Sequence, residues 1–342
     1  MLRNIRILCL LLTAALLLPL LAGCAARAEA GEVIDLDAVS ECYGPAVDLG
    51  PLSDEGVPLS FAPLAETTGI VPAPVASGTA TKENSSAVID HSNVRDGYVM
   101  VKWTGGGDPK LKVLVKGPTA GKGVYDNYQY NLRADGEYDV FPLSDGSGKY
   151  TIGVYKNTSG TQYATVLTAS IDVKLSDEFA PFLRPSQYVN YTAGSQAVKT
   201  AAEVCSGAAD NLAKVEKVYA YVVNNVSYDR VKAKTVKTGY LPDVDTTLKT
   251  GKGICFDYAA LMSAMLRSQG VPVKLVVGYT GEVYHAWINV YSEKDGWVEG
   301  KIYFDGRQWK LMDPTFASSG KQSDQIMEYI GKGENYNAKY QY

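Results

Sequence analysis

The chain has 342 residues, enough for about two domains of ordinary size together with a leader segment. Hydrophobic residues make up 46% of it, which excludes a wholly disordered protein because this much apolar surface can build a core. The formal net charge is −4 and no basic stripe with interleaved aromatic residues is present, so the composition gives no support to nucleic-acid binding.

The first 24 residues resemble an export signal. Two arginines precede the apolar run 7–18, which is too short to span a membrane comfortably. The run leads into Leu-Ala-Gly-Cys at 21–24, which resembles a bacterial lipobox, where small residues precede a cysteine that becomes acylated. We therefore predict a lipoprotein signal peptide over 1–24, lipidation of Cys24, and a protein anchored to the extracellular face of a bacterial membrane. An ordinary signal peptide or an N-terminal anchor that contains a cysteine is the alternative.

Residues 25–85 are rich in Ala, Pro, Gly and acidic side chains. Proline recurs along the segment, which disfavours regular structure. This composition predicts an extended linker between the anchor and the folded body, and parts of it could still pack on that body.

Residues 86–175 contain short runs of alternating apolar and polar residues, separated by Gly, Asp and Pro turns. This pattern predicts an antiparallel β-sandwich. The segment resembles immunoglobulin-like or fibronectin-type modules of bacterial surface proteins, a likeness that implies spacing or ligand contact as its role. The strands are expected at 98–103, 111–115, 125–132, 138–143, 150–155 and 163–175.

Residues 176–342 mix helix and strand patterns and so predict an α+β domain. Residues 178–191 are expected to be a linker. The Tyr-rich C-terminal residues 336–342 could fold over the functional site or fray, and fraying is the expectation. The elements expected between them are a helical stretch over 195–225, a loop over 232–250, a helix from Cys255 to Ser268, strands at 273–279 and 284–290, a strand pair within 296–304 and a strand that ends at Asp313.

The chain has five cysteines. Cys9 leaves with the predicted leader and Cys24 is the predicted lipidation site. Cys42, Cys205 and Cys255 are left, and an odd number in an exported protein indicates at least one free thiol. Cys42 and Cys205 could pair in an oxidising compartment, but nothing in the sequence fixes that pairing.

Cys255 lies at the start of a predicted helix, directly after a turn that contains Gly251 and Gly253. At a helix N-terminus the unpaired N–H groups and the helix dipole favour a thiolate, and the same N–H groups can stabilise a developing oxyanion. A nucleophile is well placed there. Taken alone, a cysteine at such a position is more often a small buried hydrophobic residue.

Two further residues complete a candidate catalytic set. His285 opens an alternating strand in which it shares one face with Trp287 and Asn289, so its imidazole can point towards the start of the helix. Asp313 ends a strand before a proline. Each is commonplace by itself, as a structural histidine or a turn residue. Together, thiol, imidazole and carboxylate supply the nucleophile, the base and the orienting group that Cys/His catalysis requires.

These residues resemble the core motifs of the transglutaminase-like superfamily, whose fold is of the papain-like cysteine-proteinase type. The likeness covers about residues 195–320, and its motifs occur in the family's order: Gly253-Ile254-Cys255, His285-Ala286-Trp287 and Asp313-Pro314-Thr315, preceded by a helix and Tyr-Asp element over 218–229. One departure is a longer connection between His285 and Asp313, which the strand pair within 296–304 explains.

The resemblance implies that Cys255 is the nucleophile, His285 the general base and then acid, and Asp313 the orienting carboxylate. It implies that Tyr228, and with it Trp287, line the site or its oxyanion pocket. The implied activity is acyl transfer at amide or peptide carbonyls, as a cell-surface cysteine peptidase or amidase acting on peptide or protein substrates such as cell-wall peptides. A protein-glutamine transglutaminase and an inactive binding or scaffold protein are the alternatives.

No cofactor and no metal are expected. The domain has a single histidine and no CxxC spacing, which makes a zinc site improbable. No glycine-rich loop precedes a Lys-Ser or Lys-Thr pair, so nucleotide chemistry has no support in the sequence.

Overall fold

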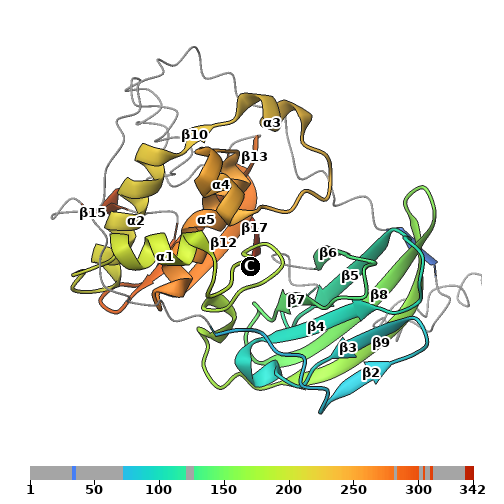
Figure 1. Ribbon diagram of the computed structural model, residues 1–342. Helices are drawn as coiled ribbons and strands as arrows, with labels where there is room; N and C mark the ends of the chain where they lie inside the picture. Colours follow the sequence, from blue (N-terminus) through green and yellow to red (C-terminus); the bar gives the residue numbers. More distant parts are fainter. Residues whose placement is uncertain are drawn as a thin grey trace, which may run out of the picture.

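The computed structural model describes residues 33–35, 72–120, 127–280, 283–299, 303–304, 309–310 and 336–342. These residues form an all-β body and a mixed body of helices and strands. Figure 1 shows the sheets of the all-β body at the lower right and the mixed body at the upper left, with strand β17 (Tyr336–Gln341) and the end of the chain between them. No helix within the described ranges is both long and apolar enough to cross a membrane.

The all-β body consists of two antiparallel sheets. The four-stranded sheet has the order β2 (Thr81–Glu83), β3 (Ala87–Asp90), β4 (Tyr98–Trp103) and β7 (Asp139–Pro142). The five-stranded sheet has the order β1 (Val33–Asp35), β9 (Gln162–Val173), β8 (Gly148–Ser159), β5 (Leu111–Lys116) and β6 (Tyr128–Leu132). Side chains from both sheets share one hydrophobic core. The likeness to immunoglobulin-like or fibronectin-type modules stays a prediction.

Two of these strands come from the segment expected to be a linker. Strands β1 and β2 both lie within residues 25–85, and they pair with β9 and β3 respectively. Part of the segment therefore packs on the folded body. The domain boundaries themselves stay predictions, and Cys24 and Cys42 lie outside the described residues.

The second body packs helices on a four-stranded antiparallel sheet. Its central helix is α5 (Cys255–Ser268), whose residues are nearly all buried because it contacts helices on one side and strands β12 and β13 on the other. The other helices are α1 (Gln196–Val204), α2 (Asn211–Asn225), α3 (Arg230–Thr235) and α4 (Val244–Thr250). The sheet has the order β14 (Gly296–Val298), β13 (Val283–Ser292), β12 (Val273–Thr280) and β17.

Short elements complete the fold. They are the parallel pair β10 (Ser227–Tyr228) and β11 (Lys252–Gly253), the antiparallel pair β15 (Tyr303–Phe304) and β16 (Trp309–Lys310), and the 3₁₀ turns η2 (Val94–Asp96) and η3 (Ala180–Phe182).

Two expectations about the helices were wrong. The single helical stretch over 195–225 is two helices, because Gly207 adopts a left-handed φ of 68° and Asp210 then caps α2, accepting a hydrogen bond from the N–H of Ala213 at 2.9 Å. The expected loop over 232–250 contains most of α3 and all of α4. Both helices begin at an aspartate N-cap.

The expectation that residues 336–342 fray was also wrong, because this segment forms β17 and pairs with β12. Gly278 makes the pairing possible, since a Cβ there would lie 2.1 Å from the carbonyl oxygen of Asn337. The fully buried guanidinium of Arg267 donates 2.7 Å hydrogen bonds to the carbonyls of Val273 and Tyr342. Burial lowers the pKa of Arg267 to about 10. Arg267 therefore ties α5 to both strands.

Candidate active site

Cys255 is the first residue of α5, and local backbone geometry fixes its place. Gly251 ends α4 with a left-handed φ of 62°, and β11 then pairs with β10 before α5 begins. Gly253 allows α5 to start close by, since a Cβ there would lie 2.7 Å from the Cβ of Asp257. The thiol of Cys255 is free and half-buried. It thus lies at the positive end of the helix dipole, among N–H groups of the first turn.

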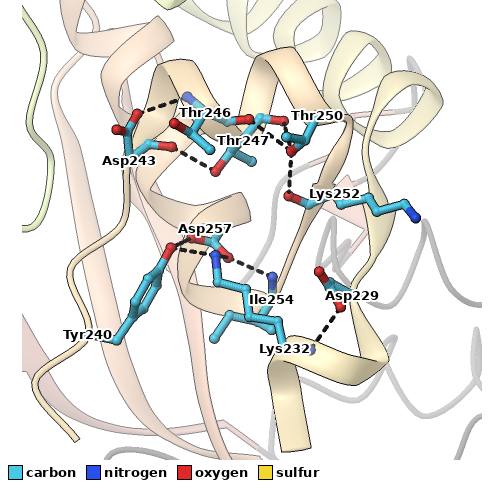
Figure 2. A network of polar contacts seen from close by, with 10 residues as sticks. All are labelled: Asp229, Lys232, Tyr240, Asp243, Thr246, Thr247, Thr250, Lys252, Ile254 and Asp257. Carbon is cyan, nitrogen blue, oxygen red and sulfur yellow. Dashed lines mark hydrogen bonds and ion pairs between the residues drawn. The ribbon is translucent and has the colours of Figure 1, made fainter. Parts of the chain in front are cut away.

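A buried carboxylate anchors this helix start (Figure 2). Asp257 is fully buried, and it accepts hydrogen bonds from the N–H of Ile254 at 2.8 Å, Nζ of Lys232 at 2.7 Å and the hydroxyl of Tyr240 at 2.5 Å. The pKa of Tyr240 is raised well above its usual value, first by burial and then by the hydrogen bond to Asp257 and the charge of that carboxylate. The three partners hold the first turn of α5 against α3 and the loop before α4.

Sequence reasoning missed this network. An acidic residue at the third position after the N-cap is a recognised sign of a helix start. Ile254 is the N-cap of α5, and Asp257 is the third residue after it. That signal could have identified Asp257 as the residue that satisfies the helix start. Nothing in the sequence marks Lys232 or Tyr240 as its partners.

His285 lies in β13, where residues alternate between the two faces of the sheet. Ala286 and Ile288 belong to the hydrophobic core that α5 shares, whereas Trp287 and its cross-strand neighbour Val276 do not. His285 and Trp287 therefore share the face opposite to that core. On that face the ring of Tyr336 lies 5.1 Å from the ring of Trp287 and 6.4 Å from that of His285, measured between centroids.

Cys255 and His285 line one cavity of about 70 Å³. Two of the predicted catalytic residues, far apart in the chain, thus contribute to one cavity, one from the start of α5 and the other from the beginning of β13. Tyr228 and Trp287 are not among the described residues that line it: Tyr228 is half-buried and paired with Gly253. Asp313 lies outside the described residues.

The arrangement places a nucleophile type and a base type at one mostly apolar cavity. A thiol at a helix N-terminus, on a cavity that His285 also lines, can form a covalent acyl intermediate when a carbonyl compound enters. In the part of the chain that the structure describes, no three His, Cys, Asp or Glu side chains gather as metal ligands would.

Comparison with known proteins finds similarity in this region. Residues 198–314 match the family model of the transglutaminase-like superfamily. The chain is 37% identical over 67 residues to a UPF0252 protein of Methanocaldococcus jannaschii, covering 18% of this chain and 19% of that protein. It is 30% identical over 104 residues to the uncharacterised protein YebA of Bacillus subtilis, covering 25% and 14%. It is 25% identical over 105 residues to a protein-glutamine gamma-glutamyltransferase of Pseudomonas aeruginosa, covering 27% and 14%.

The chain thus spans less than a fifth of the length of each of these relatives. Among solved structures, it is similar to a candidate cysteine protease from Cytophaga hutchinsonii, with 18% identity, a TM-score of 0.33 and coverage of 64% of this chain and 78% of that one. A candidate protease from Parabacteroides distasonis matches with 12% identity and a TM-score of 0.27, covering 63% of each chain.

Proposed function

We propose, from the premise that residues 198–314 form a domain of the transglutaminase-like superfamily, that this protein is an enzyme of thiol-dependent acyl transfer. In this proposal Cys255 is the nucleophile, His285 the general base and acid, and Asp313 the group that orients the imidazole. The substrate is an amide or peptide, and water is the usual acceptor, which makes the enzyme a cysteine peptidase or amidase.

The reaction proceeds through a thioester. The thiolate of Cys255 attacks the carbonyl carbon, the C–N bond breaks, and the imidazolium of His285 donates its proton to the leaving amine. N–H groups in the first turn of α5 stabilise the negative charge that develops on the carbonyl oxygen. Water then gives a proton to the imidazole and its hydroxide to the thioester carbonyl, which releases a carboxylic acid and restores the thiolate–imidazolium pair.

One observation supports this proposal most strongly: the half-buried free thiol at the first residue of α5 lines the same cavity as His285. Catalysis needs the nucleophile and its base at one place that a substrate can enter. The role given to Asp313 rests on the family motif Asp313-Pro314-Thr315.

The test is to trap the acyl intermediate. The protein is mixed with the p-nitrophenyl ester of an acetylated amino acid, and intact-mass and peptide-mapping mass spectrometry follow the adduct. We expect an acyl adduct on Cys255, no such adduct in Cys255→Ala, and a slower release of the acyl group in His285→Ala. An adduct elsewhere, or ester hydrolysis that is equally fast in Cys255→Ala, would refute the proposal.

Transfer to an amine is the second candidate, and the similarity to the Pseudomonas aeruginosa protein-glutamine gamma-glutamyltransferase favours it. The two outcomes differ only in the acceptor that resolves the thioester. A dansylated amine offered together with a glutamine-containing protein separates them. Incorporation that depends on Cys255 would exclude a pure hydrolase, whereas substrate cleavage without incorporation would identify one.

The proposal also includes the location of the protein in the cell. Acylation of Cys24 would tether the protein to the outer face of a bacterial membrane. Residues 25–85 would be an extended linker that lets the folded body act at a distance from the membrane, and the sandwich would act as an immunoglobulin-like spacer. An enzyme held there meets cell-wall peptides first. Metabolic labelling with an alkynyl fatty acid tests the anchor. Label that persists in Cys24→Ser would contradict it.

A further inference from the structure

The cavity at Cys255 and His285 has walls from both bodies of the protein. The sandwich contributes Lys112, Gln129 and Asn131, from strands β5 and β6. In β6 the buried residues alternate with Gln129 and Asn131, so these two side chains face away from the sandwich core and towards the cavity.

Direct contacts hold β6 in place beside α5. The hydroxyl of Tyr188 donates to the carbonyl of Gln129 at 3.3 Å, and the ring of Tyr188 lies edge-on to Phe256, the residue after the thiol, with centroids 5.3 Å apart. Nε2 of Gln187 donates to the carbonyl of Asn131 at 2.6 Å. Two carbonyls of an edge strand are thereby satisfied, so β6 is a fixed wall of the site.

The loop before α4 closes the gap between the two bodies. Tyr240 lines the cavity and donates its hydroxyl hydrogen to Asp257, two residues after the thiol. Its neighbour Gly239 has a φ of 86°, and a Cβ there would lie 2.4 Å from Nδ2 of Asn131. The loop is thus fixed to α5 at one residue and lies against β6 at the next.

The lining next to the thiol is apolar and aromatic. From the second body it includes Leu241, Phe256, Val277, Tyr284, Ala286 and Tyr340. The sandwich side adds Lys112 and the amide side chains of Gln129 and Asn131. The apolar part of this lining stabilises an apolar group by removing it from water.

We propose that this cavity binds the side chain of the residue whose carbonyl Cys255 attacks. It selects a bulky apolar side chain, aromatic or branched aliphatic, and strand β6 of the sandwich forms part of the selecting wall. The sandwich is then a component of the substrate site. This inference rests on the proposed acyl transfer at Cys255.

The test measures how fast side-chain-bearing reagents alkylate Cys255 in the full chain. N-acetyl chloromethyl ketones of Phe, Leu, Gly, Asp and Lys are compared, and each rate is divided by the rate with iodoacetamide, which has no side chain. We expect the Phe and Leu reagents to react at least about tenfold faster than the Gly reagent, because each buries an apolar group.

A charge on β6 tests the contribution of the sandwich. Gln129→Glu keeps the shape of the side chain, and Tyr188 bonds only the main-chain carbonyl of this residue, so the wall is retained. We expect the ratio of the Lys rate to the Asp rate to rise by about threefold or more. Ser170→Glu adds the same charge at an exposed position of β9 in the same sheet, outside the cavity, and should leave the ratio unchanged.

The outcomes separate the two proposals. Equal normalised rates for the Phe, Leu and Gly reagents would overturn the specificity pocket even if Cys255 forms acyl adducts. A ratio that changes equally in Gln129→Glu and Ser170→Glu, or in neither, would overturn the role of β6. If Cys255 forms no acyl adduct at all, the proposed function fails first.

Discussion

Two helix ends of the second body each have a free cysteine: Cys205 follows the last residue of α1, and Cys255 is the first residue of α5. Cys205 is buried, and burial raises its pKa to about 11 although Lys214 and Lys217 act in the opposite direction. The negative end of the α1 dipole also disfavours a thiolate there. Cys255 is half-buried, opens onto a cavity and lies at the positive end of its helix.

The difference shows that the surroundings of a thiol depend on which end of a helix it occupies. Cys205 packs as a small hydrophobic residue of the core, whereas Cys255 opens onto a cavity that His285 also lines. The two thiols therefore serve as each other's controls in all of the following predictions except the one on Asp257 and Asp245.

The largest expected difference is in catalysis. Cys255→Ala should lower kcat/KM for the p-nitrophenyl ester or a peptide substrate by a factor on the order of 10⁴ to 10⁶, because the acyl intermediate cannot form. Cys205→Ala should leave kcat/KM within about twofold, since the thiol is not part of the cavity. Steady-state kinetics on both variants checks this. Comparable losses of kcat/KM in the two variants would contradict the different roles of the two cysteines.

The second difference concerns the anchoring of the two helix starts. Asp257→Ala should lower the free energy of unfolding by about 3 kcal/mol or more, because it leaves the ammonium of Lys232 without its buried partner at the start of α5. At the start of α1, half-buried Asp245 accepts a hydrogen bond from the N–H of Ala197 at 2.9 Å, and Asp245→Ala should cost only about 1 kcal/mol.

Urea titration of both variants measures these two costs. If Asp245→Ala proves the more damaging, Asp257 does not anchor α5 in the way described above.

The third difference is the rate of thiol modification. Near pH 8 iodoacetamide should modify Cys255 at least about tenfold faster than Cys205, because the raised pKa and the burial of Cys205 leave little accessible thiolate. Peptide mapping by mass spectrometry assigns the label to each residue. Equal rates for the two thiols in the folded protein would show that position on the helix does not control their reactivity.

The last difference is in stability at high pH. Above about pH 9 the unfolded chain loses the Cys205 proton while the folded chain retains it until about pH 11. The folded state then binds more protons, so the contribution of Cys205 to stability is complete below pH 9 and falls as pH rises to 11. Cys205→Ala should show a shallower loss of stability than the parent between these values, measured by urea titration at each pH.

The sequence predicted the elements that local signals determine. Helix α5 has the bounds expected from its apolar run, and β4 spans the residues expected from its alternation. Helix α4 was missed because Thr and Lys dominate it, although Asp243 caps it and accepts from the N–H of Thr246 at 2.8 Å. Strand β17 was missed because its pairing depends on the distant residue Gly278.

Some residues of the candidate site could likewise be predicted from local signals, and others could not. Cys255 and His285 could be selected from motifs, because residue type and element position together mark them. Lys232 and Tyr240 could not, since they meet Asp257 only through the path of the loop before α4. The contribution of the sandwich to the cavity could not be predicted from the sequence either, because no local pattern encodes which strand lies beside which helix.

The most direct test of the account is the pH dependence of Cys255 alkylation by iodoacetamide, measured with and without His285. If the imidazole assists the thiol, the parent protein should react readily at about pH 6 to 7, and His285→Ala should lose at least about tenfold of that rate while reacting normally near pH 9. His91→Ala, which alters the other histidine of the chain, should behave like the parent. Identical rate profiles for the parent and His285→Ala would contradict the catalytic role of the pair.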